Sequence, residues 1–276
     1  MGTDSGEGFP ADGEGPARRV TVSAFSIAPA VVSNEEFRAF VRSTGYITRA
    51  EEAGSSFVFY LQVSPALRRQ ARAVPQGLPW WLCVADACWQ RPEGPGSSIG
   101  DRLDHPVVHV SWHDAQAYCR WAGVRLLTEA QWEYAARGGL RGKRYPWGDD
   151  VPGEPCCNIW RGQFPNAPAA GWRPATVPVR SFAPNAYDLY GMAGNVWEWC
   201  EDWFSPDYHL ATAPADPLQA RPTGRRSARG GSFLCHDSYC NRYRVAARGS
   251  NTPESSSSNQ GFRVAGDAAG TGDARA

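Results

Sequence analysis

The sequence has no excess of charge of either sign and no long apolar run. Lysine plus arginine and aspartate plus glutamate each number 28 among 276 residues, so the formal net charge is zero. A balanced charge gives no general electrostatic attraction to nucleic acid or to an anionic membrane. No apolar run approaches the roughly 18 residues that a membrane helix needs. We therefore expect neither a nucleic-acid partner nor a membrane partner.

Signals for export are also missing. The opening stretch MGTDSGEGFPADGEGP has neither a basic start nor an apolar core, and a secretory signal peptide has both. No asparagine is followed two places later by Ser or Thr, so the chain has no N-glycosylation sequon.

Turn-forming and aromatic residues are abundant. The chain has 29 glycines and 22 prolines beside 12 tryptophans, 10 tyrosines and 11 phenylalanines. This mixture favours an irregular, loop-rich fold packed around aromatic side chains over a helical bundle. A chain of this length can still form one domain with a sizeable core.

Three segments carry the start and stop signals of short helices. In residues 33–45, Ser33 and Glu36 have the spacing of a capping box, and Gly45 marks the end. The aromatics inside this segment recur at helical spacing, which indicates core packing. The other segments with this plan are residues 111–123 and 128–139.

Short strand-like runs lie before, between and after these helices, and the second half of the chain has almost no helical periodicity. Few helices beside many short strands and long connections predict an α+β fold with function carried on loops. We expect a single domain over residues 1–276 with a core at about 2–265. The composition predicts disordered ends at 1–18 and 266–276. The expected strands are residues 20–28, 105–110 and 262–266.

Three histidines recur at every fourth position. On a helix, His105, His109 and His113 would form a metal-binding face. Pro106 and the β-branched residues around it argue against a continuous helix there. We expect these histidines to be structural.

The chain has eight cysteines, which is many for a protein of a reducing cytosol but far below the density of a small disulfide scaffold. Cys83 and Cys88 have the same spacing as Cys235 and Cys240, so a tetrathiolate zinc site is conceivable. Zinc sites more often use a gap of two residues, which favours a local disulfide or two free thiols at the first pair. The remaining cysteines, expected to be structural, are Cys119, Cys156, Cys157 and Cys200.

The second pair lies in a loop that has the composition of a site. Ser232, His236 and Tyr239 offer hydrogen bonds near Cys235 and Cys240. Arg242 and Arg244 favour a thiolate. Two thiolates without further ligands suit a soft ion of low coordination number, and ligand softness favours Cu(I). A simple disulfide that closes the loop is the alternative left open by the spacing.

Several longer stretches resemble the sulfatase-modifying-factor family. They include residues 104–139, with TEAQWEYAARGG, and residues 185–204, with GNVWEW. The stretch CHDSYCNRYRVAAR followed by NTPESSSSNQGFR is similar to the formylglycine-generating members, and the match covers about residues 2–265. The resemblance implies a fold related to C-type lectins with little regular secondary structure.

The resemblance also implies an activity. It is the copper-dependent oxidation by O2 of one cysteine, in an unfolded sulfatase segment of the type CxPxR, to Cα-formylglycine. Cys235 and Cys240 would bind Cu(I), and Cys240 would meet the substrate. The residues that match the pocket lining are Ser232, Trp197, Tyr239 and Asn259.

Structural Ca2+ is implied as well, at two sites. Each site departs from the family pattern, since Ala170 and Gly191 stand where a side-chain ligand is usual. The matched ligands are Asn158, Ile159 and Trp172 at the first site and Gly194, Val196 and Glu198 at the second.

Other departures bear on location and substrate. The disulfide positions of secreted relatives hold Ala136 with Val245 and Cys119 with Val264. Loss of these bridges predicts a cytoplasmic, bacterial-type protein, which we expect to be a monomer. Ser55 stands where relatives often have an acidic residue that contributes to recognition of the substrate arginine.

Two alternative functions belong to other classes of protein. One is a non-catalytic ligand-binding or protein-binding module of the same lectin-like fold, which would not need both thiols of the Cys235 and Cys240 pair. The other is an iron-dependent sulfur-transfer oxidase, disfavoured because no histidine-rich helical domain is visible in the sequence.

Overall fold

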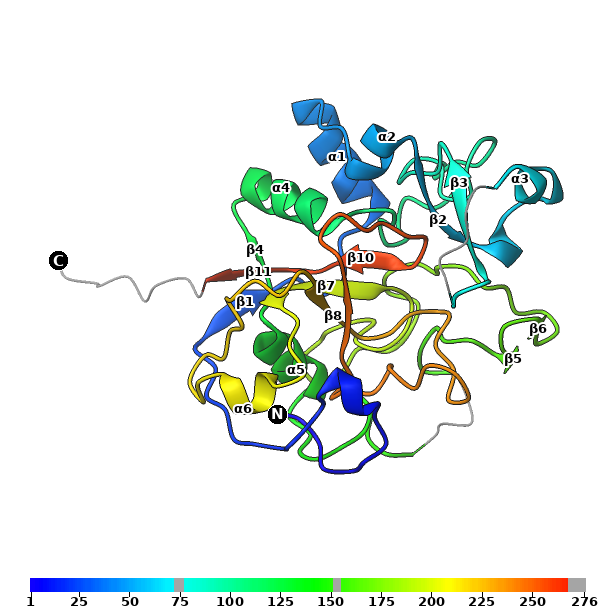
Figure 1. Ribbon diagram of the computed structural model, residues 1–276. Helices are drawn as coiled ribbons and strands as arrows, with labels where there is room; N and C mark the ends of the chain where they lie inside the picture. Colours follow the sequence, from blue (N-terminus) through cyan, green and yellow to red (C-terminus); the bar gives the residue numbers. More distant parts are fainter. Residues whose placement is uncertain (72–76, 151–154, 268–276) are drawn as a thin grey trace.

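The computed structural model describes residues 1–71, 77–150 and 155–267. Short helices and small sheets are joined by long loops (Figure 1), and this α+β arrangement confirms the predicted fold class. The helices are α1 (Asn34–Thr44), α2 (Arg49–Ala53), α3 (Pro65–Gln70), α4 (Trp112–Ala122), α5 (Glu129–Arg137) and α6 (Tyr208–Ala211), with 3-10 turns η1 (Pro10–Asp12) and η2 (Tyr60–Gln62). The strands are β1 (Phe25–Ile27), β2 (Ser55–Phe59), β3 (Trp81–Ala85), β4 (Arg125–Leu126), β5 (Gly162–Gln163), β6 (Ala167–Pro168), β7 (Trp197–Trp203), β8 (Arg226–Arg229), β9 (Gly249–Asn251), β10 (Gln260–Phe262) and β11 (Val264–Asp267).

The central sheet has the strand order β10-β7-β8-β9. Its β10 and β7 are parallel, and the other pairs are antiparallel. A smaller sheet has the strand order β1-β11-β4. Its strand β11 follows β10 in the chain and so connects the two sheets. Helices α1 and α4 lie on one side of these strands and α5 lies on the other (Figure 1). The main core lies beneath α1 and α4, where Phe37, Phe40 and Trp199 are buried together.

The three helices expected from the sequence are confirmed with their caps. Ser33 and Glu36 form a reciprocal capping box at α1, and Gly45 ends that helix in the left-handed conformation. Ser111 and Thr128 cap α4 and α5 in the same way. Helix α2 was missed, although Thr48 and Glu51 form a further capping box.

The strand expectations are only partly confirmed. Of residues 20–28, β1 uses only Phe25–Ile27. Residues 105–110 form no ladder, because His109 has a φ of 59° and the backbone N–H of Val107 bonds to Val32 in a loop contact. Residues 262–266 are divided between β10 and β11, and Arg263 lies between these strands.

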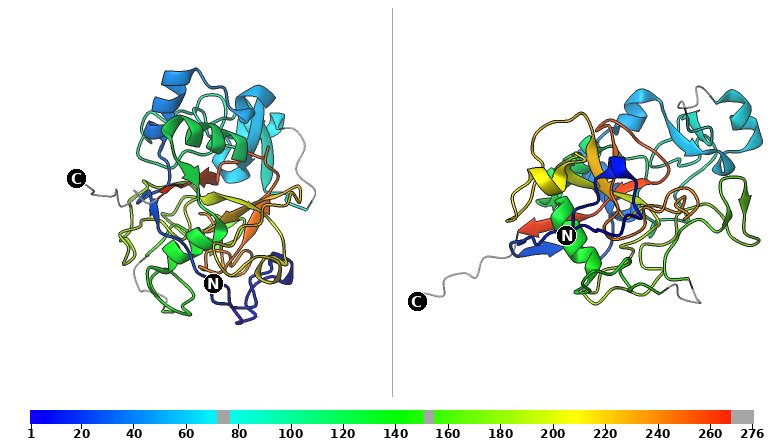
Figure 2. Two further views of the ribbon diagram at one scale, coloured as in Figure 1. Left: turned by 90° about the vertical axis from the view of Figure 1, so that its left-hand side faces the viewer. Right: turned by 60° about the horizontal axis from the view of Figure 1, so that its bottom comes forward.

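The N-terminal segment is ordered, so the prediction of a disordered 1–18 is wrong. Figure 2 shows this segment running beside the chain near residues 240–250. Glu14 accepts two hydrogen bonds from the buried guanidinium of Arg244, and the Arg248 guanidinium donates to the carbonyl oxygen of Asp12. These contacts fix the segment by paired charges, which composition alone does not reveal. At the other end, β11 includes Gly266 and Asp267, and residues 268–276 lie outside the described part.

Buried arginine and glutamate pairs join the helices to the central sheet. Arg229 donates to Glu133 at 2.6 Å, and Arg248 contacts Glu129 at 2.7 Å, with all four side chains at most 1% exposed. The nearby guanidinium groups lower the pKa of Glu133 to about 2 in spite of its burial. Buried charges need such partners because their desolvation is costly.

Among the described residues, no helix combines the length and the apolar character needed to cross a bilayer.

Candidate functional site

Cys235 and Cys240 lie in a tight loop between β8 and β9. The Cys235 N–H donates to the carbonyl of Ser232, and the Cys240 N–H donates to that of His236 at 2.7 Å. These turns bring the two sulfur atoms to 2.8 Å from each other. Gly231 has a φ of 71°, and a Cβ there would lie 3.1 Å from the Cys235 sulfur and 2.9 Å from a backbone oxygen. The glycine therefore allows the backbone to approach the Cys235 sulfur closely.

The two thiols have different electrostatic surroundings. Cys235 is 1% exposed and Cys240 is 7% exposed. Burial, followed by its contact with Cys240, raises the pKa of Cys235 well above its usual range. The hydrogen bond from Cys235, with help from the Arg242 guanidinium, lowers the pKa of Cys240 to about 7. Cys240 is therefore the thiol that ionises first and the more accessible of the pair.

Arg242 is the cation next to this pair. Its Nη1 lies 3.9 Å from the Cys240 sulfur, while Nε and Nη2 donate to the Asp12 carboxylate. Arg244, expected beside the thiolates, instead forms a buried pair with Glu14. Of these two arginines, only Arg242 contacts the thiol pair. Asp12 of the N-terminal segment fixes the position of its guanidinium.

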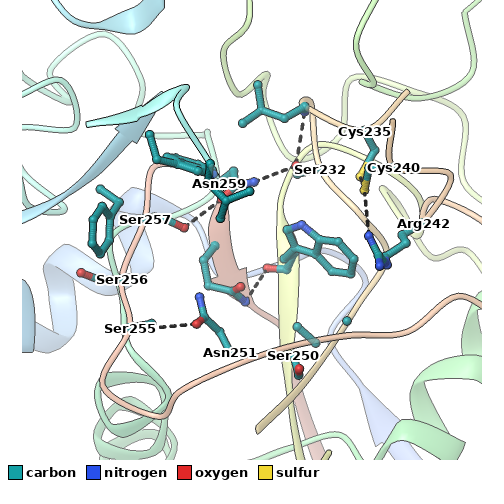
Figure 3. Close-up of a pocket in the computed structure, with 18 of the residues that line it drawn as sticks. Ser232, Cys235, Cys240, Arg242, Ser250, Asn251, Ser255, Ser256, Ser257 and Asn259 are labelled. Atoms are coloured by element: carbon teal, nitrogen blue, oxygen red, sulfur yellow. Dashed lines mark hydrogen bonds between the residues drawn. The ribbon is translucent and has the colours of Figure 1, made fainter. Parts of the chain in front are cut away.

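A chain of polar side chains lies beside the cysteines. The side-chain Nδ2 of Asn259 donates to the Ser232 hydroxyl at 2.9 Å, and the Ser257 hydroxyl donates to the side-chain Oδ1 of Asn259 at 2.8 Å (Figure 3). Ser232 also receives the backbone N–H of Leu234. These bonds fix the rotamers of a hydroxyl and an amide at the cavity wall, which is a requirement for orienting a reacting group.

Trp197 forms another part of this wall. The backbone N–H of Trp197 donates to the backbone carbonyl of Asn259 at 2.9 Å, at the end where β7 and β10 pair. A Cβ at Gly249 would lie 2.8 Å from the Trp197 ring. The glycine thus leaves room for the indole.

Tyr239 belongs to an aromatic wall on the other side of the loop. Its ring stacks on Phe164 at 4.3 Å between centroids and meets the edge of Trp80 at 4.9 Å. Tyr239 is 37% exposed, so its face is accessible from the cavity.

All six predicted pocket residues line one open cavity of about 510 Å³. The cysteines and Arg242 lie at one end, and Ser250, Asn251 and Ser255 lie at the other (Figure 3). This shape can hold an extended peptide segment with a cysteine brought to the thiol pair. The six residues are Cys235, Cys240, Ser232, Trp197, Tyr239 and Asn259.

The other metal possibilities receive no support from the geometry. His109 is buried and bonds to Ser56 and to the carbonyl of Pro92, and His105 bonds to Thr176. Throughout residues 1–71, 77–150 and 155–267, no three or more His, Cys, Asp or Glu side chains are grouped to hold a metal ion. Cys83 and Cys88 are not joined by a disulfide, as in the second of the two alternatives expected for this pair, and they belong to no such ligand group.

The two implied calcium sites differ in how well their residues suit the ion. At the first, Asn158 donates through Nδ2 to Ala175 and Asn195. Its Oδ1 and the carbonyls of Ile159 and Trp172 accept none of the hydrogen bonds found within the described chain. Amide and carbonyl oxygens are among the ligands that a hard cation such as Ca2+ binds. Ala170 adds no further ligand.

The second calcium site does not fit. Both carboxylate oxygens of Glu198 accept hydrogen bonds from Arg263, and Oε2 also accepts one from Trp132. Gly194 and Val196 were expected to contribute only their carbonyls, which leaves Glu198 as the one charged ligand of this site. Because the guanidinium already neutralises Glu198, a divalent cation would meet a positive neighbour instead of a free ligand.

The cysteine pair does suit a soft monovalent ion by its donors. Two adjacent sulfurs with no third His, Cys, Asp or Glu ligand in the described chain favour Cu(I) over zinc or calcium. Cys235 and Cys240 are therefore the residues that would hold copper.

Asp12 was not anticipated from the sequence. The signal was present, because Asp12 and Glu14 are two residues apart, as are their partners Arg242 and Arg244. Matched spacing of opposite charges can indicate pairing between distant segments, but its use requires knowing that the segments are adjacent.

Comparisons with known proteins identify the family of this chain. The sulfatase-modifying factor enzyme 1-like domain matches residues 1–268. The formylglycine-generating enzyme of Thermomonospora curvata is 55% identical, with 97% of this chain and 90% of that protein covered. A Bos taurus relative called inactive Cα-formylglycine-generating enzyme 2 is 47% identical over 96% of this chain and 84% of its own length.

A solved structure supports the fold. PvdO from Pseudomonas aeruginosa has a TM-score of 0.69 and 25% identity, with 97% of this chain and 90% of that chain covered. The family model and the identity over nearly the full length lead to one conclusion: this chain belongs to the sulfatase-modifying factor enzyme 1-like family.

Proposed function

We propose that this protein converts a cysteine of a sulfatase polypeptide to Cα-formylglycine, with Cu(I) held by Cys235 and Cys240 and O2 as the oxidant. The likeness to formylglycine-generating enzymes at 55% identity supports the reaction class. Since an inactive relative is 47% identical, family membership alone does not carry the proposal.

The observation that carries it is the paired thiol centre inside a peptide-sized cavity. The sulfurs are 2.8 Å apart, and Cys240 faces the cavity beside Arg242. A purely structural pair would not need a thiol at the wall of an open cavity with its pKa lowered to about 7. This arrangement provides a thiolate at neutral pH where a substrate cysteine can approach.

In the reaction, the substrate Cβ–S unit loses two electrons and two protons, and dioxygen takes up both and is reduced to hydrogen peroxide. Water then replaces sulfur at Cβ, which leaves the aldehyde and releases sulfide. When bound, Cu(I) would supply the centre at which a thiolate and O2 meet. The Arg242 guanidinium stabilises negative charge on the Cys240 sulfur.

The side chains around the thiols position the reactants. The Ser232 hydroxyl is fixed by Asn259 and can donate to an oxygen atom in the cavity. Trp197 and Tyr239 provide two walls that can orient the peptide backbone. Each of these residues contributes orientation, and none is required to change its protonation state.

The residues at Ser55 and Ser56 offer little to the arginine of a CxPxR segment, because neither lines the cavity. Ser56 is buried, and its hydroxyl bonds to Ser256 and to His109. Ser55 contributes no charge to pair with a substrate arginine. We therefore expect weak discrimination between arginine and a neutral residue at that place.

The proposal is tested by incubating the copper-loaded full chain with a CxPxR peptide in air and trapping the aldehyde with an aminooxy reagent. An aldehyde product that requires both copper and O2 supports the proposal. Peptide binding without any aldehyde would instead favour the non-catalytic binding module. The matched control is the same peptide with serine in place of cysteine.

A further inference from the structure

Arg225 is a cation at the end of the cavity remote from the cysteines. It precedes β8, and its side chain lines the cavity with Ser250 and Asn251. Its Nε donates to the Ser250 hydroxyl at 2.9 Å, and Nη2 donates to the Ser250 carbonyl at 2.6 Å. These two bonds hold the guanidinium in one orientation, although the residue is exposed.

This guanidinium has no carboxylate within ion-pair distance among the residues that the structure describes. The neighbouring Arg226 differs, because its guanidinium lies between the rings of Trp112 and Trp203 and donates to the carbonyl of Glu201. Arg225 is thus an oriented, unpaired cation that faces the cavity.

The acidic side chain that lines the cavity does not neutralise the charge of Arg225. Asp12 is the acidic residue that lines the described wall, and both of its oxygens are taken by Arg242. The rest of the remote end is made of hydroxyl and amide groups of Ser250, Asn251 and Ser255. A ligand at this end would meet a positive charge and neutral hydrogen-bonding groups.

We propose that Arg225 forms an anion subsite that binds an acidic side chain of the substrate polypeptide. This inference rests on the proposed function, and it specifies the substrate class beyond the reacting cysteine. An extended peptide that places its cysteine at the thiol pair continues along the cavity toward β8 and β9. A Glu or Asp side chain there would accept a charge-assisted bond from Arg225, whose geometry suits a carboxylate.

The test uses amidated CxPxR peptides in which each flanking residue in turn is Glu, Gln or Lys. We expect one position at which Glu exceeds Gln in kcat/KM by roughly two- to fivefold, the size of one partly exposed ion pair. Lys at that position should be worse than Gln. The preference should shrink in concentrated salt, because exposed charges are screened.

Variants assign the preference to the residue. R225Q should abolish it, R225E should reverse it, and R225K should retain most of it. R221E is the matched control, since Arg221 is also exposed but does not line the cavity, and it should leave the preference unchanged. An unchanged preference for Glu in R225E would overturn the proposal, as would equal rates for all peptides with the wild type.

A binding measurement separates this inference from the proposed reaction. Fluorescence anisotropy of labelled peptides with serine in place of cysteine reports the charge preference without turnover. A preference for Glu that depends on Arg225, with no aldehyde from cysteine peptides, would support the subsite and refute the oxidase. Aldehyde formation without any charge preference would support the oxidase and refute the subsite.

Discussion

Asp12 and Arg242 form a two-point ion pair across 230 residues of sequence, at 2.5 and 3.2 Å, and this pair aims the guanidinium at the sulfur of Cys240. The N-terminal segment therefore contributes to the thiol centre although it supplies neither thiol. Glu14 and Arg244 form the neighbouring pair and do not contact the cysteines. These two pairs provide a variant and its control within one segment.

Asp12→Asn should lower kcat by roughly tenfold with a smaller change in KM, because a charge-assisted contact that positions Arg242 is weakened. Asp12→Glu should restore part of kcat. Steady-state rates with a CxPxR peptide measure both. Glu14→Gln should lower the melting temperature but leave kcat close to the wild-type value. Equal losses of kcat in Asp12→Asn and Glu14→Gln would show that the pair is only structural.

The thiol pair should show a pH-dependent reactivity in copper-free protein. The pKa of Cys240 is lowered to about 7, and the pKa of Cys235 is raised by burial. Because the thiolate reacts and the thiol does not, iodoacetamide should modify Cys240 faster as the pH rises through about 7. Peptide mapping of the alkylated protein identifies the residue. In Arg242→Ala the midpoint should move to higher pH, and a midpoint near 9 in the wild type would contradict the assigned environment.

Glu198 should stabilise the fold through Arg263 without help from calcium. Glu198→Gln leaves a buried guanidinium without its counter-ion, which costs about 3–5 kcal/mol. Chemical denaturation should show this loss to the same extent in Ca2+ and in EDTA. The surface variant Asp149→Asn serves as the control, because its pair with Lys143 is exposed. A loss seen only in the presence of Ca2+ would assign Glu198 to a metal site after all.

Gly249→Ala should disturb the cavity wall while the fold persists. The added Cβ would lie 2.8 Å from the Trp197 ring, so the indole must move and change the space for substrate. We expect KM for the peptide to rise several-fold and tryptophan fluorescence to change. The control is Gly100→Ala, which also needs no left-handed backbone and whose Cβ would meet the Ser98 hydroxyl at an ordinary contact distance of 3.5 Å. An unchanged KM in Gly249→Ala would show that Trp197 does not limit the peptide site.

The sequence predicted best those features that short-range chemistry determines. The capping residues Ser33, Ser111 and Thr128 mark helices because a cap is satisfied within three residues. The loop of Cys235 and Cys240 was identifiable as a candidate site for the same reason, because its hydrogen-bonding and charged residues are close in sequence. Fold class followed from the few helices and many turn residues.

Long-range pairing was the part that could not be predicted. The strand expected at 105–110 failed because a strand needs a partner, and here His109 bonds to the loop at Ser257 instead. The segment 1–18 has the composition of a disordered tail, yet the buried Arg244 and Arg248 order it through Glu14 and the Asp12 carbonyl. Such contacts depend on which distant segments fold side by side.

The most direct test of the account is the aldehyde yield of copper-loaded wild type, Cys235→Ala and Cys240→Ala with a CxPxR peptide in air, quantified by aminooxy labelling. Cys200→Ala is the control, since Cys200 is buried and free but lies outside the cavity. We predict aldehyde from the wild type and from Cys200→Ala, and none above background from either variant of the pair. Aldehyde formation by Cys240→Ala at the wild-type rate would contradict the central role of the thiol pair.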